Sequence, residues 1–481
     1  MNGRAPVDPS AILFKGAGTW DAIAIAVAGM APTMAMNLNP QEPAEHVGRV
    51  VPLVFALSTF VVLLVAWCFA RLAHHHPNAG SAYGFVGAIL GPRAGLVAGW
   101  TLLGTYLCFA IVGLGAFGLF GANLLQRLSV WQEPSSFVLT GIAALIIAPL
   151  SVIPTRRAGL VLILLEGVAV VAMLVLACAV IARVLQGHGP QGDPPLRDLF
   201  IPAAGVGAAS IAMGLSFGLL SFAGFEQVAT LGEEVEKSRF TIPRVLIGTV
   251  LGAGVVFALV TAAQTLGFGT NPAGVSRFTH STSLLADLSA TYFGGWSGDL
   301  FDALAIASAL GGALASIVAS ARILFALSRD LAPSSVLARI SEASGTPHNA
   351  AVCVVVAAIA GYAAMRVAFH ASASDAFFWG STLGALALLI VYLLVAVSAA
   401  GALIRWPKEG ARWMLLIPAL AVLAIAYTLW INIRSPDPGA YHVIPWIVLL
   451  WCCAPILATL LHPRLVYLIT SGFLAASSRE K

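Results

Sequence analysis

The sequence predicts an all-α integral membrane protein with about twelve transmembrane helices. Of its 481 residues, 59% are hydrophobic and only 10% are charged, and the mean hydropathy is +0.92. A soluble domain is usually about a quarter charged. Runs of about 20 apolar residues, enough to cross about 30 Å of hydrocarbon as a helix, recur along the whole chain. These observations leave no room for a large soluble domain between the spans.

Twelve apolar spans account for most of the chain. The first span follows a polar opening stretch, residues 1–18, without the charged and then apolar pattern of a cleaved leader, so we expect it to stay in the protein. The expected spans are residues 19–37, 50–72, 94–122, 136–153, 159–186, 204–233, 242–266, 298–327, 349–368, 376–404, 412–432 and 443–461.

The distribution of lysine and arginine predicts the orientation. Most of the 25 basic residues lie between spans that face the same side as the N-terminus. Because cytoplasmic loops keep positive charge, we expect a multi-pass protein of the cell (plasma) membrane with both termini in the cytoplasm. The net charge of +4 follows from this asymmetry and indicates no nucleic-acid partner. The sequence gives no indication of an oligomeric state.

The reactive side chains argue against several classes of protein. The six cysteines lie in or beside apolar spans, and their spacing matches neither a metal site nor a disulfide framework, so we expect them to be small buried apolar residues. No nucleophile–base pair, metal-ligand cluster or G-x-x-x-x-G-K-[ST] motif is visible. The sequence therefore predicts no enzyme, no ATP-driven pump, and no metal or other cofactor.

Two spans carry residues that interrupt a helix. In the first span, "AGMAP" (28–32) combines Gly29 with Pro32, which removes a backbone donor and clashes with the preceding turn. A simple proline kink explains this stretch equally well. In the sixth span, "SFAGFE" (221–226) places a glycine and a carboxylate in an apolar run. Broken helices at the start of two groups of five spans are typical of inverted-repeat transporters.

The sequence with these two interrupted spans resembles the amino acid-polyamine-organocation (APC) superfamily of permeases. The resemblance covers residues of about 15 to 465 and rests on four stretches in the family's order. These are "GMAPT", "NAGSAYGFVGAILGPRAGLVAGW", "SFAGFEQVATLGEEVEKSRFTIPRV" and "SARILFALSRDLAPSSVLARISEASGTP".

The resemblance implies a leucine-transporter-like fold, a five-plus-five inverted repeat with helices 1 and 6 broken. The implied divisions are a cytoplasmic N-terminal segment, a transport core with its two repeats, two additional helices and a cytoplasmic tail. Their ranges are 1–18, 19–404 (repeats of about 19–186 and 204–404), 405–462 and 463–481.

The resemblance also implies where an amino acid would bind. Backbone amides of Met30 and Ala31 would hold its carboxylate, and carbonyls of the sixth helix would receive its ammonium, with Phe222 as a gate. At the position of the second glycine in the relatives' Gly-x-Gly motif of helix 1, this chain has Ala31. Its side chain narrows the space through which a substrate carboxylate would approach the backbone. The substrate-binding positions implied on helices 1 and 6 are Gly29, Met30, Ala31, Phe222, Ala223 and Gly224. Tyr106 of the third span is expected to line the cavity with its hydroxyl.

Two acids lie inside apolar spans, where a charge is costly. Glu226 is expected to hold the broken sixth helix by accepting backbone donors, although titration during transport is an alternative. Glu166 lies in the fifth span, where some proton-coupled relatives carry a lysine in place of a sodium ion. Burial favours the protonated carboxyl, as a proton carrier requires, so proton coupling is favoured over a structural hydrogen bond.

Sodium is the alternative coupling ion. In sodium-coupled members of the wider fold, helix 8 hydroxyls contribute to an oxygen cage, and Ser316 is suitably placed for that role. Helix 8 is also rich in small residues that permit close packing, which is the ordinary explanation of such serines.

The function that the resemblance implies is secondary active transport of amino acids through the bilayer by alternating access. Because the pocket side chains named above are mostly apolar, a proton symporter for neutral amino acids is favoured. Three alternatives stay open: a polyamine or amine permease, an amino acid exchanger, and a membrane sensor that binds a solute without moving it.

Overall fold

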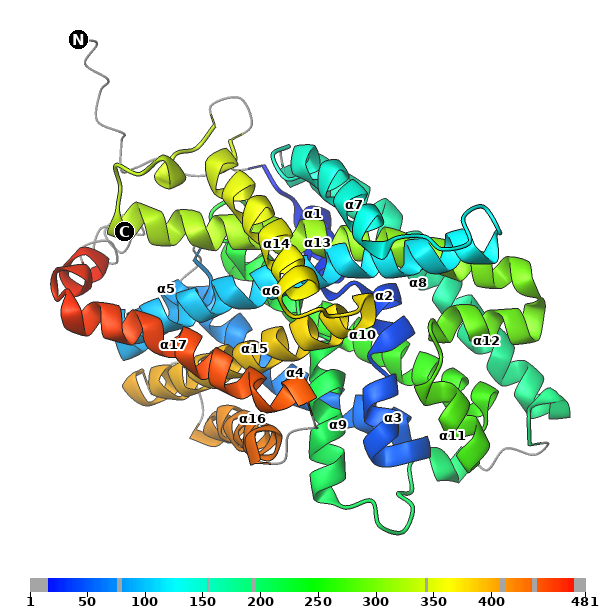
Figure 1. Ribbon diagram of the computed structural model, residues 1–481. Helices are drawn as coiled ribbons and strands as arrows, with labels where there is room; N and C mark the ends of the chain where they lie inside the picture. The colour runs from blue at the N-terminus through cyan, green and yellow to red at the C-terminus, as the bar shows by residue number, and fades with distance from the viewer. Residues whose placement is uncertain are drawn as a thin grey trace.

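The computed structural model describes residues 16–75, 80–153, 155–191, 196–341, 345–406, 412–434 and 439–470 (Figure 1). In the described part, β pairing is limited to one parallel bridge between Ala17 and Val235. The α-helices are α1 (Thr19–Met30), α2 (Pro32–Leu38), α3 (Gln41–Val47), α4 (Val51–His75), α5 (Ala82–Leu90), α6 (Pro92–Arg127), α7 (Ser136–Leu150), α8 (Thr155–Arg183), α9 (Ala208–Leu220), α10 (Ser238–Phe268), α11 (Pro272–Thr279), α12 (Leu284–Phe293), α13 (Gly295–Leu331), α14 (His348–Ala368), α15 (Ala373–Arg405), α16 (Leu416–Arg434) and α17 (Ile444–Leu461).

Short turns of tighter or wider helix connect several of these elements. The segment η4 (Phe225–Leu231) is the longest 3₁₀ helix among the described residues, and it follows α9 after a four-residue turn. The others are η1 (Gly48–Val50), η2 (Val184–His188), η3 (Leu196–Leu199), η5 (Val336–Ala338), η7 (Arg412–Leu415) and η8 (Gly439–His442).

The helices correspond to the expected spans. By length and composition, ten candidates in the described part are able to cross a membrane, and the bent pair α9 and η4 makes an eleventh. The remaining expected span, the fourth (residues 136–153), is the apolar helix α7, which at 15 residues is shorter than a full crossing. The chain is therefore a multi-pass membrane protein.

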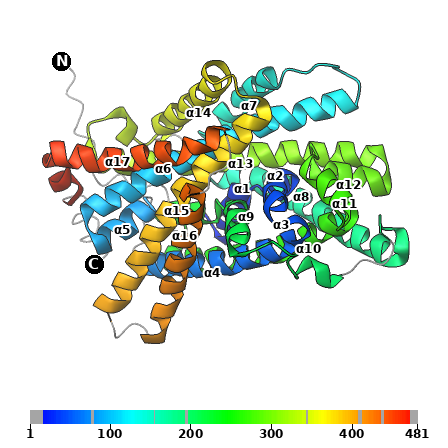
Figure 2. The ribbon, with the colours of Figure 1, turned by 60° about the horizontal axis from the view of Figure 1, so that its bottom comes forward.

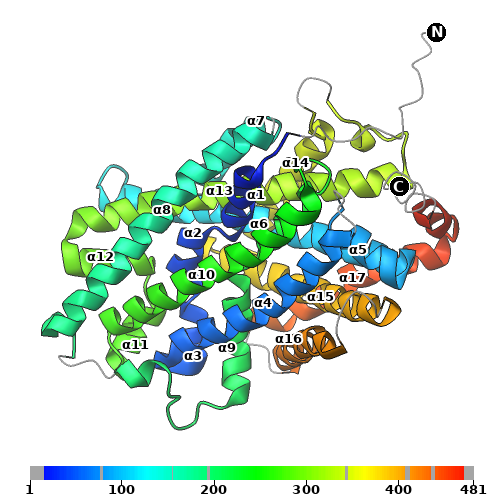
Figure 3. The ribbon, with the colours of Figure 1, turned by 180° about the vertical axis from the view of Figure 1, so that it is seen from behind.

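The first helix lies at the centre of the bundle. In Figure 1, α1 and α2 run between longer helices, and α1 packs against α8, α10, α13 and η4. Seen from behind, α8, α10 and α4 lie side by side over this centre (Figure 3). The long helices α6 and α13 make the most extensive contact of any two elements described.

Small residues allow α6 and α13 to approach closely. A Cβ atom at Gly113 of α6 would lie 2.9 Å from the carbonyl oxygen of Ala309 and 2.9 Å from the Cβ of Ala313, both on α13. In a membrane, where lipid tails are as apolar as leucine, such close backbone packing is a main source of helix association. The Gly- and Ala-rich composition of these helices thus serves packing first.

The last two helices lie outside the central group. Figure 2 shows α16 and α17 along one side of the bundle, where α16 packs on α15 and α4 and α17 packs on α6 and α15. Three of the cysteines, Cys178, Cys353 and Cys453, are exposed on the outside of the bundle. The expectation that all six are buried in the protein was therefore wrong, since an apolar helix also presents such residues to the surrounding lipid.

Candidate functional site

The first helix is interrupted at Ala31. Helix α1 ends at Met30, Ala31 has φ 42° and ψ 61°, and α2 begins at Pro32. A positive φ is uncommon for a residue with a side chain. The N–H of Ala31 donates to the carbonyl of Ala28 over 3.0 Å, a tighter turn than that of an α-helix. The local cause is Pro32, which has no N–H to continue the helix.

A second interruption separates α9 from η4. Helix α9 ends at Leu220, a turn follows, and η4 runs on at 41° to α9. Gly224 closes the turn with φ 108°, a conformation that favours glycine because it has no Cβ. The two apolar runs that stood out in the sequence are thus the places where the backbone leaves α-helical geometry.

The two interruptions touch each other. A Cβ atom at Gly29 would lie 2.7 Å from the carbonyl oxygen of Gly224, and a Cβ at Gly224 would overlap the carbonyl group of Gly29. Backbone therefore faces backbone at this contact, and neither position has room for a side chain.

A pocket opens beside this contact. Five predicted residues line it: Gly29, Met30, Ala31, Ala223 and Ser316. Its other walls are largely apolar and come from four further elements, α2, α6, α9 and α15. These walls include Phe109 and Val112 of α6, Leu220 of α9 and Phe377 of α15.

Five predicted residues lie away from the pocket lining: Phe222, Tyr106, Gly224, Glu226 and Glu166. Phe222 is fully buried and packs edge-on against Phe257, with ring centroids 5.0 Å apart. In this conformation Phe222 does not cover the pocket. The hydroxyl of Tyr106 is buried near Glu226 without a hydrogen bond of ordinary geometry. Gly224, in the turn, and Glu226, in the first turn of η4, lie behind the lining.

Glu226 is bonded to the turn that precedes it. The N–H of Gly224 donates to both carboxylate oxygens, at 3.1 and 3.3 Å, and the hydroxyl of Tyr392 on α15 donates to Oε2 over 2.9 Å. These contacts match the helix-holding arrangement expected of this acid. Phe225 packs against Phe69 and Tyr392.

Glu166 lies on α8 and is 1% exposed. Its Oε2 accepts a hydrogen bond of 3.1 Å from the hydroxyl of Ser308 on α13. Its Oε1 has no hydrogen-bond partner among the described residues. The two acids therefore differ. Glu226 accepts from two donors, whereas Glu166 accepts from one, and no described residue bonds its Oε1.

Several polar residues that the sequence analysis did not single out contribute to this region. Gln227 donates through Nε2 to the hydroxyl of Ser316 over 3.1 Å, which joins η4 to α13. Asn39, in the pocket lining, donates to the hydroxyl of Ser221 over 3.0 Å. A polar amide inside an apolar span was the signal available for Gln227, since such groups need a partner when buried.

Comparison with known proteins assigns the family. The sequence pattern described as amino acid permease matches residues 21–456. The chain belongs to the amino acid permease family. It is therefore a transporter of amino acids.

Individual relatives are more distant. The permease is 29% identical to the branched-chain amino acid permease BcaP of Lactococcus lactis subsp. cremoris, over 75% of its own length and 79% of that protein. It is 25% identical to BcaP of Bacillus subtilis, over 62% and 63% of the two chains. It is 26% identical to the low-affinity putrescine importer PlaP of Escherichia coli (strain K12), over 44% and 45%.

An ionic network of the permease lies on the face predicted to be cytoplasmic. Arg322 and Glu234, both 3% exposed, are joined by two hydrogen bonds of 2.5 and 3.0 Å. The backbone carbonyl of Glu234 also accepts from the N–H of Ala17, over 3.2 Å. The segment after η4 is thus tied both to α13 and to the residues that precede α1.

Two further polar contacts lie on this face. Arg329 makes two bonds of 3.2 Å to Glu233, and Tyr83 of α5 donates to Asp330 over 2.7 Å. Burial, together with the charge of Asp330, raises the pKa of the Tyr83 hydroxyl above its ordinary value. Tyr83 therefore keeps its proton and remains a donor at neutral pH.

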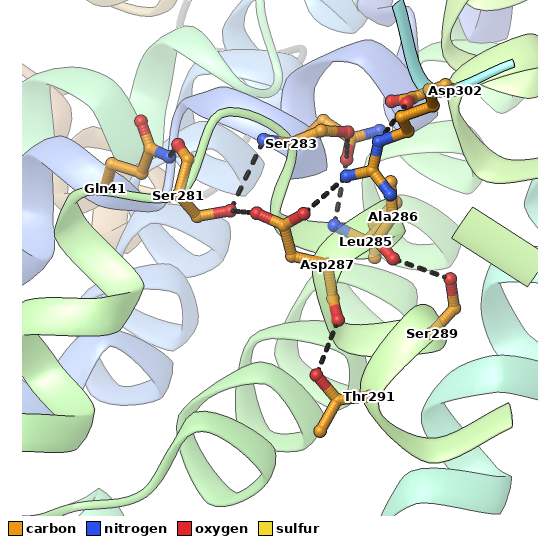
Figure 4. Close-up of polar contacts among 11 residues, drawn as sticks. Gln41, Ser281, Ser283, Leu285, Ala286, Asp287, Ser289, Thr291 and Asp302 are labelled. Carbon is orange, nitrogen blue, oxygen red and sulfur yellow. Dashed lines mark hydrogen bonds and ion pairs between the residues drawn. The ribbon is translucent and has the colours of Figure 1, made fainter. Parts of the chain in front are cut away.

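A second polar cluster of the permease lies on the opposite face (Figure 4). Asp287 of α12 accepts from Arg127 over 2.5 Å and from Ser281 over 2.7 Å. Asp302 of α13 lies 3.2 Å from the same guanidinium. The side-chain oxygen of Asn37 on α2 accepts from Ser283 and from the N–H of Leu285, at 2.9 Å each. The segment that contains α11 and α12 is thereby joined to α2, α6 and α13.

Proposed function

We propose that the permease takes up neutral amino acids across the cell membrane, with both termini in the cytoplasm, and that it works by alternating access. The observation that carries the proposal is the pocket where the two interruptions meet. Its lining combines irregular backbone, which can bond the polar ends of a small solute, with apolar walls. The family assignment over residues 21–456 agrees with this proposal.

The two interruptions are proposed to be the broken helices of a five-plus-five inverted repeat. The first repeat runs over about 19–186 and the second over about 204–404, and each begins with one of the interrupted spans. Irregular backbone inside a membrane is tolerated where it is buried in protein or faces a cavity. The contact of Gly29 with Gly224 and the adjacent pocket are consistent with that arrangement.

The proposed substrate is an aliphatic amino acid. Its carboxylate would accept from the amides of Met30 and Ala31, with Ala31 giving up its bond to the Ala28 carbonyl on binding. Its ammonium would donate to carbonyls of the turn that contains Ala223. Its side chain would then face Phe109 and Val112, which are apolar. The names of the two BcaP relatives, both branched-chain amino acid permeases, favour leucine, isoleucine and valine.

A diamine is the second candidate substrate, because one relative is named as a putrescine importer. A diamine carries two positive charges and no carboxylate, so it would need an acid in the pocket. No aspartate or glutamate is among the residues that line the described pocket. That composition favours the amino acid over the diamine.

Proton coupling through Glu166 is proposed, with sodium coupling as the alternative. Support comes from the burial of Glu166 and from its unbonded Oε1, because an isolated carboxylate in such a place gains most from taking a proton. Ser316, the residue considered for sodium, accepts from Gln227 and lines the pocket.

The proposal is tested by uptake into proteoliposomes. Labelled leucine, alanine, lysine and putrescine would be offered under a proton gradient and, separately, under a sodium gradient. Accumulation of leucine driven by an inward proton gradient supports the proposal. Accumulation driven by a sodium gradient alone would show that sodium, and not the proton, is the coupling ion. Uptake of putrescine in preference to leucine would overturn the substrate. Flux only against a preloaded amino acid would indicate an exchanger, and leucine binding without flux would indicate a sensor.

A further inference from the structure

Glu166 lies directly behind one wall of the pocket. Two consecutive glycines of α13, Gly311 and Gly312, lie between Glu166 and the pocket. A Cβ atom at Gly311 would lie 3.1 Å from Oε1 of Glu166, whereas a Cβ at Gly312 would lie 2.7 Å from the Cβ of Ala31. Gly312 and Ala31 both line the pocket. Only the backbone of α13 therefore stands between the carboxyl and the residues that face a bound solute.

A chain of two hydrogen bonds joins this carboxyl to α2. Ser308 donates through its hydroxyl to Oε2 of Glu166 over 3.1 Å. The same hydroxyl oxygen accepts from the backbone N–H of Met34 over 3.2 Å. Met34 lies three residues after the interruption at Ala31 and also lines the pocket. Ser308 is thus the polar link between the buried acid and the pocket.

The surroundings of Glu166 offer no compensating charge among the described residues. Helix α8 packs against α1, α2, α10, α12 and α13. The charged groups on these helices include Asp21, Arg239, Arg244, Asp287, Asp302 and Arg322, and among the described residues no hydrogen bond or ion pair joins any of them to Glu166, whose polar contact is with Ser308. Oε1 is buried, and no described residue forms a hydrogen bond with it. A carboxylate in such a site is strongly disfavoured unless it takes up a proton or a cation.

We propose that Ser308 is a positioning residue that couples the protonation of Glu166 to the binding of an amino acid in the pocket. The inference rests on the proposed function. When Glu166 is ionised, it holds the Ser308 hydroxyl in one orientation, and its charge repels a carboxylate on the other side of α13. A proton from the solution on the open side, added at Oε1, removes that repulsion.

The coupling is reciprocal. If a proton on Glu166 strengthens amino acid binding, then amino acid binding must strengthen proton binding by the same factor. The amino acid and the proton therefore bind together on one side and are released together on the other side. No covalent bond other than the O–H bond of the carboxyl forms or breaks in this cycle.

The inference is tested by proton uptake on binding. Leucine is added to the full-length protein in a weakly buffered detergent solution, and both the heat of binding and the change in pH are measured. We expect uptake of protons with leucine, and a Kd for leucine that rises about tenfold or more with pH across the neutral range. Leucine binding without any proton uptake would overturn the inference, and this measurement needs no variant.

Substitutions then separate the role of Ser308 from a purely structural one. E166Q is expected to bind leucine with no proton uptake and with a Kd independent of pH. S308A should flatten the pH profile of the Kd, and S308T, which keeps a hydroxyl, should restore it. The matched control is S320A on the same helix, because Ser320 is equally buried and its hydroxyl has no partner among the described residues.

The outcomes distinguish the two proposals. If the unmodified protein binds no amino acid, the proposed function fails. If it binds leucine with proton uptake but S308A keeps the pH profile of the unmodified protein, Ser308 has no coupling role. If S320A flattens the profile as strongly as S308A does, the effect comes from repacking of α13 and the assignment of Ser308 is overturned.

Discussion

Gly29 and Gly224 meet backbone to backbone at the centre of the bundle. A Cβ atom at Gly29 would lie 2.7 Å from the carbonyl oxygen of Gly224 and 2.6 Å from Oε1 of Gln227. The two interrupted segments, far apart in the chain, are therefore packed as one unit. Any side chain added at this contact must separate them, which would alter the adjoining pocket.

The first prediction concerns Gly224→Leu. Gly224 has φ 108°, so a side chain there adds backbone strain of about 1–3 kcal/mol besides its overlap with Gly29. We expect leucine binding to be lost while the protein still inserts and folds, because the apolar spans are unchanged. Equilibrium binding of labelled leucine to the purified protein, with size-exclusion chromatography as the folding check, measures both.

The control for this substitution is Gly248→Leu on α10. Gly248 is exposed, and no heavy atom lies within 4 Å of its Cβ position. The Gly248→Leu variant should bind leucine as the unmodified protein does. Normal binding by Gly224→Leu would contradict the placement of the pocket at the contact between the interruptions.

The apolar spans and their interruptions could be predicted from the sequence, but contacts between residues far apart in the chain could not. The ten or eleven spans of the described part follow from long apolar runs, because each segment reveals its length and polarity on its own. Gly29, Pro32 and Gly224 mark the interruptions through their local backbone chemistry. The pairing of Gln227 with Ser316 is different, because it joins residues on separate elements, and no local pattern specifies which distant groups meet.

The same limit explains the outcomes at single positions. Sequence reasoning placed Phe222 over the pocket, but the ring packs against Phe257. The direction in which an aromatic side chain points from a turn depends on the residues that pack around it. A local sequence pattern does not determine that direction. Ser308 was not singled out because serine is common in helices rich in small residues, where packing is its ordinary role.

A second prediction concerns Tyr392→Phe. The change removes the hydroxyl that donates to Oε2 of Glu226 over 2.9 Å, and the buried acceptor is left one donor short. We expect the free energy of unfolding to fall by about 1–3 kcal/mol, measured by chemical denaturation in mixed micelles. Tyr362→Phe is the control, because the buried hydroxyl of Tyr362 has no partner among the described residues. An equal loss in both variants would show that the bond to Glu226 contributes nothing.

A third prediction concerns the buried pair of Arg322 and Glu234. Arg322→Leu leaves the carboxylate of Glu234 buried without this partner, and we expect a loss of about 3–5 kcal/mol in the free energy of unfolding. Replacing both residues by leucine should recover most of the loss, because no buried charge then remains unpaired.

The comparison for this pair is Glu233→Gln. The ion pair of Glu233 with Arg329 is more exposed, with side chains 16% and 21% accessible, so its removal should cost about 1 kcal/mol or less. If the single Arg322→Leu change costs no more than Glu233→Gln, the buried pair is not the stabilising contact that its geometry indicates.

A fourth prediction concerns the size of the pocket. Val112→Phe fills space beside Phe109 and should exclude large aliphatic side chains while alanine still binds. We expect the preference for leucine over alanine to fall about tenfold or more, measured by competition for labelled alanine. Val255→Phe is the control, because Val255 is 70% exposed on α10. Unchanged selectivity in Val112→Phe would place the substrate side chain against another wall.

The most direct test of the account is a structure of the protein determined with saturating leucine. We predict density for leucine in the pocket, with its carboxylate at the amides of Met30 and Ala31, its ammonium at the turn that contains Ala223, and its side chain toward Val112. Density for leucine at any other place, or an empty pocket under conditions where leucine binds, would contradict the account.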